Sequence, residues 1–239
     1  LFNYQKTDHK ARSLWKSFGG KTPHISYEIY GSVTGRLTTK SNSFPILNLK
    51  KEIADIVEPT NDAFIQFDLN GAEIRTLLSL SGEPQPQEDI HEFNAKILKC
   101  TREKAKKKFF AWFYNPNKKN IGLSEFYKRD KVLEKHYSNG IIRTPFGRKI
   151  EADDFHSFNY LLQSSSSDNC LQQAIKINKF LHGRKSFVHS VVHDSITIDF
   201  HKHDRDLVNQ IRQIFEDTRL GKFRSSMHIG KNYRDMEVV

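Results

Sequence analysis

Two aspartates stand at the ends of apolar segments in a chain that is otherwise strongly basic. Asp68 closes the apolar run AFIQF, and Asp194 lies between the strand-like residues Val192 and Ile196. Burying an unpaired carboxylate costs free energy, and two neighbouring carboxylates repel each other unless cations lie between them. Two Mg²⁺ ions about 3.5–4 Å apart can stabilise the attacking and leaving oxygens of a displacement at phosphorus. The pair therefore predicts a two-metal site, although a single strand-end aspartate more often only caps a turn.

A second pattern with chemical consequences lies in the segment TREKAKKKFFAWFYN, residues 101–115. Arg102, Lys106, Phe110 and Tyr114 recur every four residues, so on a helix they form one slowly curving stripe. The stripe is cationic at one end and aromatic at the other. This polarity matches the triphosphate and the base of an incoming nucleotide.

The alternative is a solvated basic face on a helix whose other side, formed by Phe109, Trp112 and Phe113, packs in the core. Further lysines stand at 104, 107 and 108. Their charges repel one another unless an anion is near, which favours the nucleotide interpretation.

Hydrophobic periodicity predicts the elements that must position these residues. Strands are expected over 63–69 and on both sides of His193–Ser195 within 186–200. A strand or hairpin is expected over 25–39, and a hairpin over 138–150. Helices are expected over 72–82, 89–114 with a split near Cys100, 123–138, 158–183 and 205–220. The serine run at 164–167 is unfavourable within the fourth of these. Strands and helices are interspersed without regular βα alternation, so the expected fold class is α+β.

Composition narrows the class of partner. The chain has 239 residues, a formal net charge of +10 and a pI near 9.5, which favours a polyanion, either nucleic acid or a membrane surface. No window approaches 18 consecutive apolar residues, so no membrane span is expected. Cys100 and Cys170 offer neither a disulfide framework nor zinc-ligand spacing, which is typical of a reducing cytoplasm.

An ordered set of motifs resembles the polymerase domain of family A DNA polymerases, the DNA polymerase I type. The set runs from about residue 25 to the end of the chain. Its first members are TGRL (34–37) with PILNL (45–49), DLNGAEIR (68–75), and DIH (89–91) followed by the 102–114 stripe. The later members are FGRK (146–149), Asn159-x3-Gln163, VHDS (192–195) and GKNYRDM (230–236). Each motif alone is weak, whereas their shared order is specific.

The resemblance implies a catalytic set. Asp68 and Asp194 would bind two Mg²⁺ ions, with the backbone carbonyl of Leu69 as a further ligand, and Lys106 would act with them on the triphosphate. Glu73 would be the steric gate that excludes a ribose 2′-hydroxyl, held in place by Tyr114.

The resemblance also implies binding residues. The nucleotide would be contacted by a group around the stripe, namely Arg102, Lys106, Phe110, Tyr114, Glu73 and His91. The primer–template would be contacted by Arg36, Asn159 and Gln163 in the minor groove and by His193 at the primer terminus.

Several residues depart from the family pattern. Ser195 stands where a glutamate is usual, and Ala111 and Asn115 replace glycines. Phe155 replaces a basic residue upstream of Asn159. The segment between Tyr114 and Ile141 is short, so the fingers are expected to be reduced, as in a bacteriophage enzyme.

The expected architecture is a right-hand polymerase palm, an antiparallel sheet backed by helices, with a reduced helical fingers subdomain. Its expected division is a thumb remnant or N-terminal extension at 1–24, palm at 25–85, fingers at 86–140 and palm again at 141–239. A processivity factor, or an upstream exonuclease or thumb region, is an expected partner. The expected location is the cytoplasm, or the host cytoplasm for a viral protein.

The resemblance implies template-directed addition of dNTPs to a primer 3′-hydroxyl. One alternative is a catalytically idle nucleic-acid-binding fragment, because a chain without a thumb would hold DNA only briefly. Another is a relative of single-subunit RNA polymerases, against which Glu73 argues, because so large a side chain would clash with a 2′-hydroxyl.

Overall fold

A five-stranded antiparallel sheet lies at the centre of the computed structural model, which describes residues 12–14, 16, 18, 24–115 and 117–239. The expected unit at 1–24 therefore lies almost entirely outside the described residues. The strands, in spatial order, are β12 (Glu237–Val238), β11 (Ser225–Gly230), β3 (Ala63–Leu69), β8 (Ser195–Phe200) and β7 (Phe187–Val192). The two predicted strand segments are thus neighbours in one sheet.

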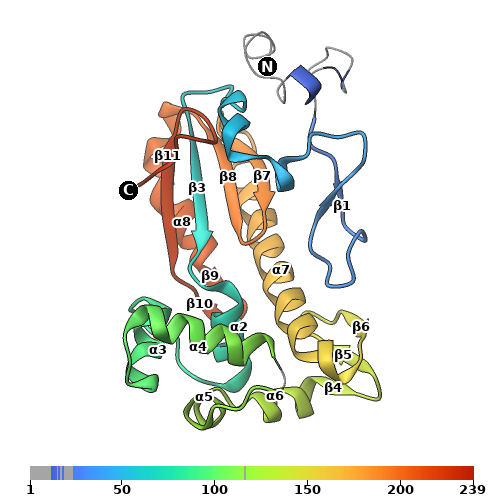
Figure 1. The fold of residues 1–239 in the computed structure, drawn as a ribbon. Helices are drawn as coiled ribbons and strands as arrows, with labels where there is room; N and C mark the ends of the chain where they lie inside the picture. Colours follow the sequence, from blue (N-terminus) through green and yellow to red (C-terminus); the bar gives the residue numbers. More distant parts are fainter. Residues whose placement is uncertain (1–11, 15, 17, 19–23, 116) are drawn as a thin grey trace.

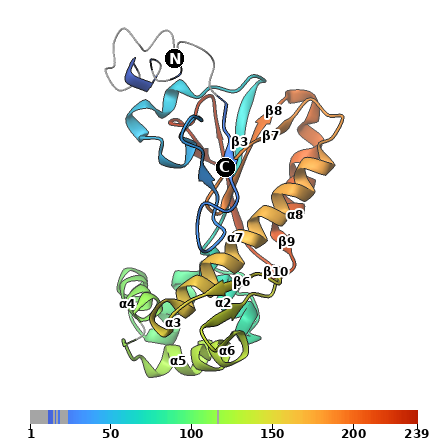
Figure 2. The ribbon, with the colours of Figure 1, turned by 90° about the vertical axis from the view of Figure 1, so that its right-hand side faces the viewer.

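Helices α7 (Asp154–Phe180) and α8 (Val208–Glu216) cover one face of this sheet (Figure 2). The core between sheet and helices contains Phe67 and Ile196 from the strands and Cys170 and Phe215 from the helices. All four side chains are fully buried. Burial of this apolar area, at about 25 cal/mol per Å², is the main term that holds the sheet to the helices.

A second core lies beyond one end of the sheet, where a cluster of helices gathers (Figure 1). These helices are α2 (Ala72–Ser81), α3 (Ile90–Leu98), α4 (Arg102–Tyr114), α5 (Ile121–Tyr127) and α6 (Arg129–His136). Phe109, Trp112 and Phe113 of α4 are buried in this core, which is the packing expected in the alternative interpretation of this segment. The opposite side of α4 carries the lysines.

The long helix α7 joins the two cores (Figures 1 and 2). Phe158 and Leu161 near its start pack in the helical cluster, while Cys170 and Ile177 pack against the sheet. The serine run does not interrupt the helix. Its four side chains are buried, and their small size allows neighbouring elements to approach the helix closely.

The remaining elements are short. They are the hairpin of β1 (Tyr27–Glu28) and β2 (Thr38–Thr39), the 3-10 helices η2 (Ile46–Asn48), η3 (Lys51–Ile56) and η4 (Lys202–Leu207), the small sheet of β4 (Tyr137–Ser138), β5 (Ile141–Arg143) and β6 (Lys149–Glu151), and the pair β9 (Asp217–Thr218) and β10 (Gly221–Lys222). Both hairpins expected from the sequence are present.

Two predicted helices differ from the structure. The helix expected over 123–138 is divided into α5 and α6 at Lys128, whose φ of 49° is left-handed and stops the first helix. The helix expected over 205–220 ends at Glu216, because Asp217–Thr218 pairs with Gly221–Lys222 instead. None of the helices in the described part of the chain is both long and apolar enough to cross a membrane.

Candidate active site

The sheet register brings Asp68 and Asp194 together. Asp68 of β3 lies directly opposite Ser195 of β8, so Asp194, the last residue of the β7–β8 turn, comes next to the end of β3. The backbone N–H of Leu69 donates a hydrogen bond to the carbonyl of Asp194 at 3.1 Å. Both carboxylates therefore stand at the end of the sheet from which the chain continues into α2 (Figure 1).

The two carboxyl groups destabilise each other's charged form. Burial, together with the negative charge of Asp194, raises the pKa of Asp68 to about 6. Burial likewise raises the pKa of Asp194, although the charge of Arg36 and a hydrogen bond from Ser166 oppose that rise. No ion pair to either carboxylate occurs within the described residues, so the charge of Arg36 offsets the cost at Asp194 without direct contact.

This donor set fits Mg²⁺ better than a metal held by protein ligands alone. In the described part of the chain, no group of three or more His, Cys, Asp or Glu side chains could enclose an ion. Mg²⁺ is commonly bound by one or two carboxylates, with waters and substrate phosphates completing its shell. Two adjacent, half-buried carboxylates supply that arrangement.

Glu73 is held at both of its carboxylate oxygens. The hydroxyl of Tyr114 donates to Oε2 at 2.9 Å, and the guanidinium of Arg36 forms an ion pair with Oε1. Burial raises the pKa of Glu73 overall, while the charge of Arg36 and the Tyr114 hydroxyl work in the other direction. The partnership with Tyr114 matches the sequence-based expectation. The ion pair with Arg36 is a contact that the sequence did not predict, and contact of Arg36 with the minor groove stays a prediction.

A tight turn places Glu73 at the beginning of α2. Gly71 has a φ of 65°, and a Cβ added there would lie only 2.8 Å from Cγ2 of Ile90. Only glycine meets both conditions without strain. The turn brings Glu73 back toward the end of β3 that carries Asp68.

The predicted stripe on α4 lies beside His91 of α3. The rings of Phe110 and Tyr114 stack at 5.7 Å, and the ring of His91 contacts Phe110 at 5.6 Å. Burial lowers the pKa of His91. The positive charges of Lys106 and Arg102 lower this pKa further, whereas the negative charge of Asp89 raises it. Four stripe residues and one histidine from separate motifs are thus neighbours.

The two cations of the stripe differ in their contacts. Arg102 donates to both oxygens of Asp89, at 3.0 and 3.2 Å, and pairs with Glu103. Asp89 also caps the start of α3. Lys106 is exposed and makes no ion pair within the described residues. Asp89 belongs to the DIH motif, but its bond to Arg102 joins two helices and left no local signal in the sequence.

The residues expected to contact DNA lie on α7 and on the β7–β8 turn. Asn159 donates to the carbonyl of Tyr114 at 3.5 Å and so links α7 to the end of α4, and Gln163 lies one turn further along α7. His193 is exposed and has a φ of 53°. Contact of these residues with DNA stays a prediction.

Contacts from Arg148 and Ser167, which the sequence did not predict, hold the β1–β2 hairpin that carries Arg36 against α7. Arg148 donates to both carboxylate oxygens of Asp168, at 3.1 and 2.6 Å. A Cβ on Gly35 would lie 2.4 Å from the Arg148 guanidinium carbon, so Gly35 leaves the space that this side chain fills. Ser167 donates to the Gly35 carbonyl at 3.3 Å. The FGRK and TGRL motifs therefore meet in space.

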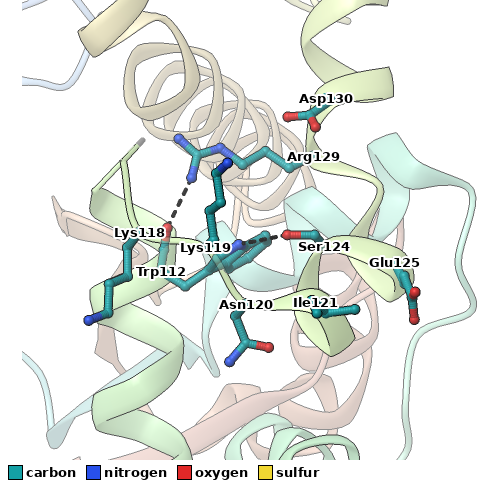
Figure 3. A pocket seen from close by; sticks show the side chains of 9 residues that line it. All are labelled: Trp112, Lys118, Lys119, Asn120, Ile121, Ser124, Glu125, Arg129 and Asp130. Carbon is teal, nitrogen blue, oxygen red and sulfur yellow. Dashed lines mark hydrogen bonds between the residues drawn. The ribbon is translucent and has the colours of Figure 1, made fainter.

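A cavity of about 350 Å³ lies among α4, α5 and the start of α6 (Figure 3). Arg129 crosses it to donate to the Trp112 carbonyl at 3.0 Å, and the Trp112 indole donates to Ser124 at 3.2 Å. Neither Asp68 nor Asp194 lines this cavity. The carboxylate site is thus distinct from it.

Comparison with known proteins supports a polymerase fold. No family model matches the chain. Over 98% of its length the chain is similar to the DNA polymerase of Bacillus phage SP01, with 23% identity, and it spans 35% of that protein. Its fold matches the POL domain of Pol1 from M. smegmatis, solved in complex with DNA primer-template and dNTP, with a TM-score of 0.73 and 16% identity, over 95% of this chain and 51% of that one. The predicted α+β polymerase fold and the resemblance to DNA polymerase I-type proteins are confirmed.

Proposed function

We propose that this chain, which has the fold of a DNA polymerase I-type polymerase domain, extends a primer 3′-hydroxyl with dNTPs under the direction of a template strand. One observation carries the proposal. Two half-buried carboxylates, with no ion pair to them among the described residues, stand side by side at the end of the sheet, where the chain continues into the helix that bears Glu73. A carboxylate pair of this kind is costly unless it binds cations.

Asp68 and Asp194, with the Leu69 carbonyl, are the residues that would hold Mg²⁺. When bound, two such ions lower the pKa of the attacking hydroxyl and stabilise negative charge on the leaving oxygen. In the proposed reaction the primer 3′-hydroxyl would lose its proton to water, its oxygen would form a bond to the α-phosphorus of the dNTP, and pyrophosphate would leave with the electron pair of the broken bond. The protein's own part is to fix the two carboxylates side by side, one on β3 and the other on the β7–β8 turn.

The α4 stripe would position the nucleotide. Lys106 and Arg102 would bind the triphosphate, and Arg102 would exchange its bond to Asp89 for a phosphate oxygen. His91 would lie near the triphosphate, and Phe110 would pack against the sugar and base. Glu73, fixed by Tyr114, would close the space where a ribose 2′-hydroxyl would project.

The DNA partner is proposed from charge and from the remaining motif residues. Arg36, Asn159, Gln163 and His193 would contact the primer–template, and the net charge of +10 would attract its phosphates. Affinity for DNA should then fall steeply as salt concentration rises. Arg36 would have to leave Glu73 in order to reach the minor groove.

The proposed subdomains are palm at 25–85 and 141–239 and fingers at 86–140. The two hydrophobic cores support a division of this kind, although α2 and the start of α7 pack in the helical core. A processivity factor and an upstream exonuclease or thumb region remain predictions, as does the cytoplasmic location.

Primer extension tests the proposal directly. The purified chain, a 5′-labelled primer annealed to a longer template, dNTPs and Mg²⁺ should give products whose sequence follows the template, and EDTA should stop the reaction. Binding of the primer–template without extension would favour the alternative of an idle binding fragment. Extension with NTPs as efficient as with dNTPs would favour the RNA polymerase alternative.

Lys106→Ala should raise the KM for dNTP about 10- to 100-fold. The expected loss is one charge-assisted contact to phosphate, worth about 1.5–3 kcal/mol. Affinity for the primer–template, measured by fluorescence anisotropy, should stay within about twofold. Lys108→Ala is the matched control, because Lys108 is an exposed lysine on another side of the same helix. A larger loss of DNA affinity than of dNTP affinity would contradict the assigned role.

A further inference from the structure

The hydroxyls of the serine run on α7 point to different partners. Ser165 donates to the carbonyl of Leu161 at 2.7 Å, within its own helix. This bond to the carbonyl four residues earlier is the usual choice of a helical serine. Ser166 instead donates to Oδ1 of Asp194 at 3.2 Å, which lies on the β7–β8 turn. Its side chain is 1% exposed, so water cannot readily replace this bond.

The neighbouring position on the sheet offers no such support. Ser195 is buried opposite Asp68, and its hydroxyl donates to the carbonyl of Val192 at 2.8 Å. It therefore neither adds a carboxylate to the site nor binds one. Among the described residues, Ser166 is the one that donates a hydrogen bond to the Asp194 side chain.

We infer that Ser166 is a positioning residue that fixes the Asp194 carboxylate for metal binding. A terminal carboxylate rotates in a broad, two-fold torsional profile, so the two oxygens of an unanchored aspartate exchange places easily. The Ser166 hydroxyl engages Oδ1 and leaves Oδ2 for the metal. Carboxylates that bind metals are commonly fixed by hydrogen bonds of this kind.

The inference rests on the proposed function, so its test measures metal binding without turnover. Mn²⁺, which prefers the same oxygen ligands, serves as the probe and is followed by electron paramagnetic resonance. The protein is bound to a dideoxy-terminated primer–template with the next dNTP. Ser166→Ala should weaken Mn²⁺ binding about 10-fold or more, as expected for loss of a group that anchors a ligand.

Two further variants keep the result interpretable. Ser165→Ala removes the adjacent hydroxyl, whose bond stays within the helix, and should leave Mn²⁺ affinity within about twofold. Ser166→Cys retains the volume of the side chain but is a weak donor, so it should lose affinity as alanine does. In steady-state extension by Ser166→Ala, raising the Mg²⁺ concentration should restore the rate, with the KM for dNTP unchanged.

The outcomes separate this inference from the proposed function. If the wild-type chain neither binds Mn²⁺ nor extends a primer, the proposed function fails and the inference with it. If the wild-type chain does both and Ser166→Ala binds Mn²⁺ equally well, the positioning role alone is overturned. An equal loss in Ser165→Ala would assign the effect to the helix rather than to the bond with Asp194.

Discussion

Replacing either Asp68 or Asp194 by alanine will lower the rate of primer extension by at least about 10³-fold. Metal ions supply several kcal/mol of transition-state stabilisation, and each 1.36 kcal/mol corresponds to a factor of ten in rate. Removing one of two adjacent carboxylates leaves a single charged ligand beside the Leu69 carbonyl, which is too few to hold both ions. Single-turnover extension on a pre-bound primer–template measures the chemical step apart from DNA binding.

The repulsion between the two carboxylates can be measured separately, through the thermal stability of an Asp68→Asn variant. The pKa of Asp68 is raised to about 6 and that of Asp194 is raised as well, so the native state binds protons more tightly than the unfolded chain. For an acid with a raised pKa, ionisation lowers stability. For Asp68 this cost is absent below about pH 4 and develops as the pH rises through about 6. Asp68→Asn should therefore melt at a higher temperature than the metal-free wild type at pH 7.5, and the difference should vanish near pH 4.

Either of two results would contradict the metal-site assignment. Extension by Asp68→Ala or Asp194→Ala at the wild-type rate is one of them. The other is an Asp68→Asn variant whose melting temperature at pH 7.5, with EDTA present, falls below that of the wild type, because removal of a repelling charge cannot then be the main change.

The parts of the fold that follow local patterns could be predicted from the sequence. The strand 63–69 shows an apolar run that ends at Asp68, and α2 begins after Gly71 and ends at Gly82, as the spacing indicates. The break between α3 and α4 likewise lies where the helical pattern is interrupted. In each case the signal lies within a few residues of the feature.

The parts that the sequence does not predict depend on contacts between distant segments. Glu73 was expected to contact Tyr114, but its ion pair with Arg36 joins residues 37 positions apart. The bond from Ser166 to Asp194 depends on how α7 packs against the β7–β8 turn, and nothing in the run of four identical serines distinguishes its third member. The division at Lys128 depends on a left-handed backbone at a lysine, for which the residue type gives no indication.

The second large effect is expected at the proposed gate, where Glu73→Ala should raise the incorporation of ribonucleotides relative to deoxyribonucleotides about 10- to 100-fold. This range corresponds to the one to three kcal/mol by which a packed site discriminates substrates that differ by a small group. The Glu73 side chain is 12% exposed, and its two oxygens are bound by Arg36 and Tyr114. When Arg36 moves to the DNA, the hydrogen bond from Tyr114 still restrains the side chain and keeps it from rotating away to admit a 2′-hydroxyl.

Matched variants separate the size of Glu73 from its restraint. Glu73→Gln keeps nearly the same volume and should retain most of the discrimination, whereas Tyr114→Phe removes the 2.9 Å hydrogen bond and should give an intermediate loss. The ratio of kcat/KM for NTP and dNTP at one template position measures each effect. If Glu73→Ala leaves this ratio unchanged, the side chain does not form the gate. If Glu73→Gln loses as much discrimination as Glu73→Ala, the charge of Glu73 and its ion pair with Arg36 matter more than its size. Glutamine preserves the volume of the side chain and removes only its charge.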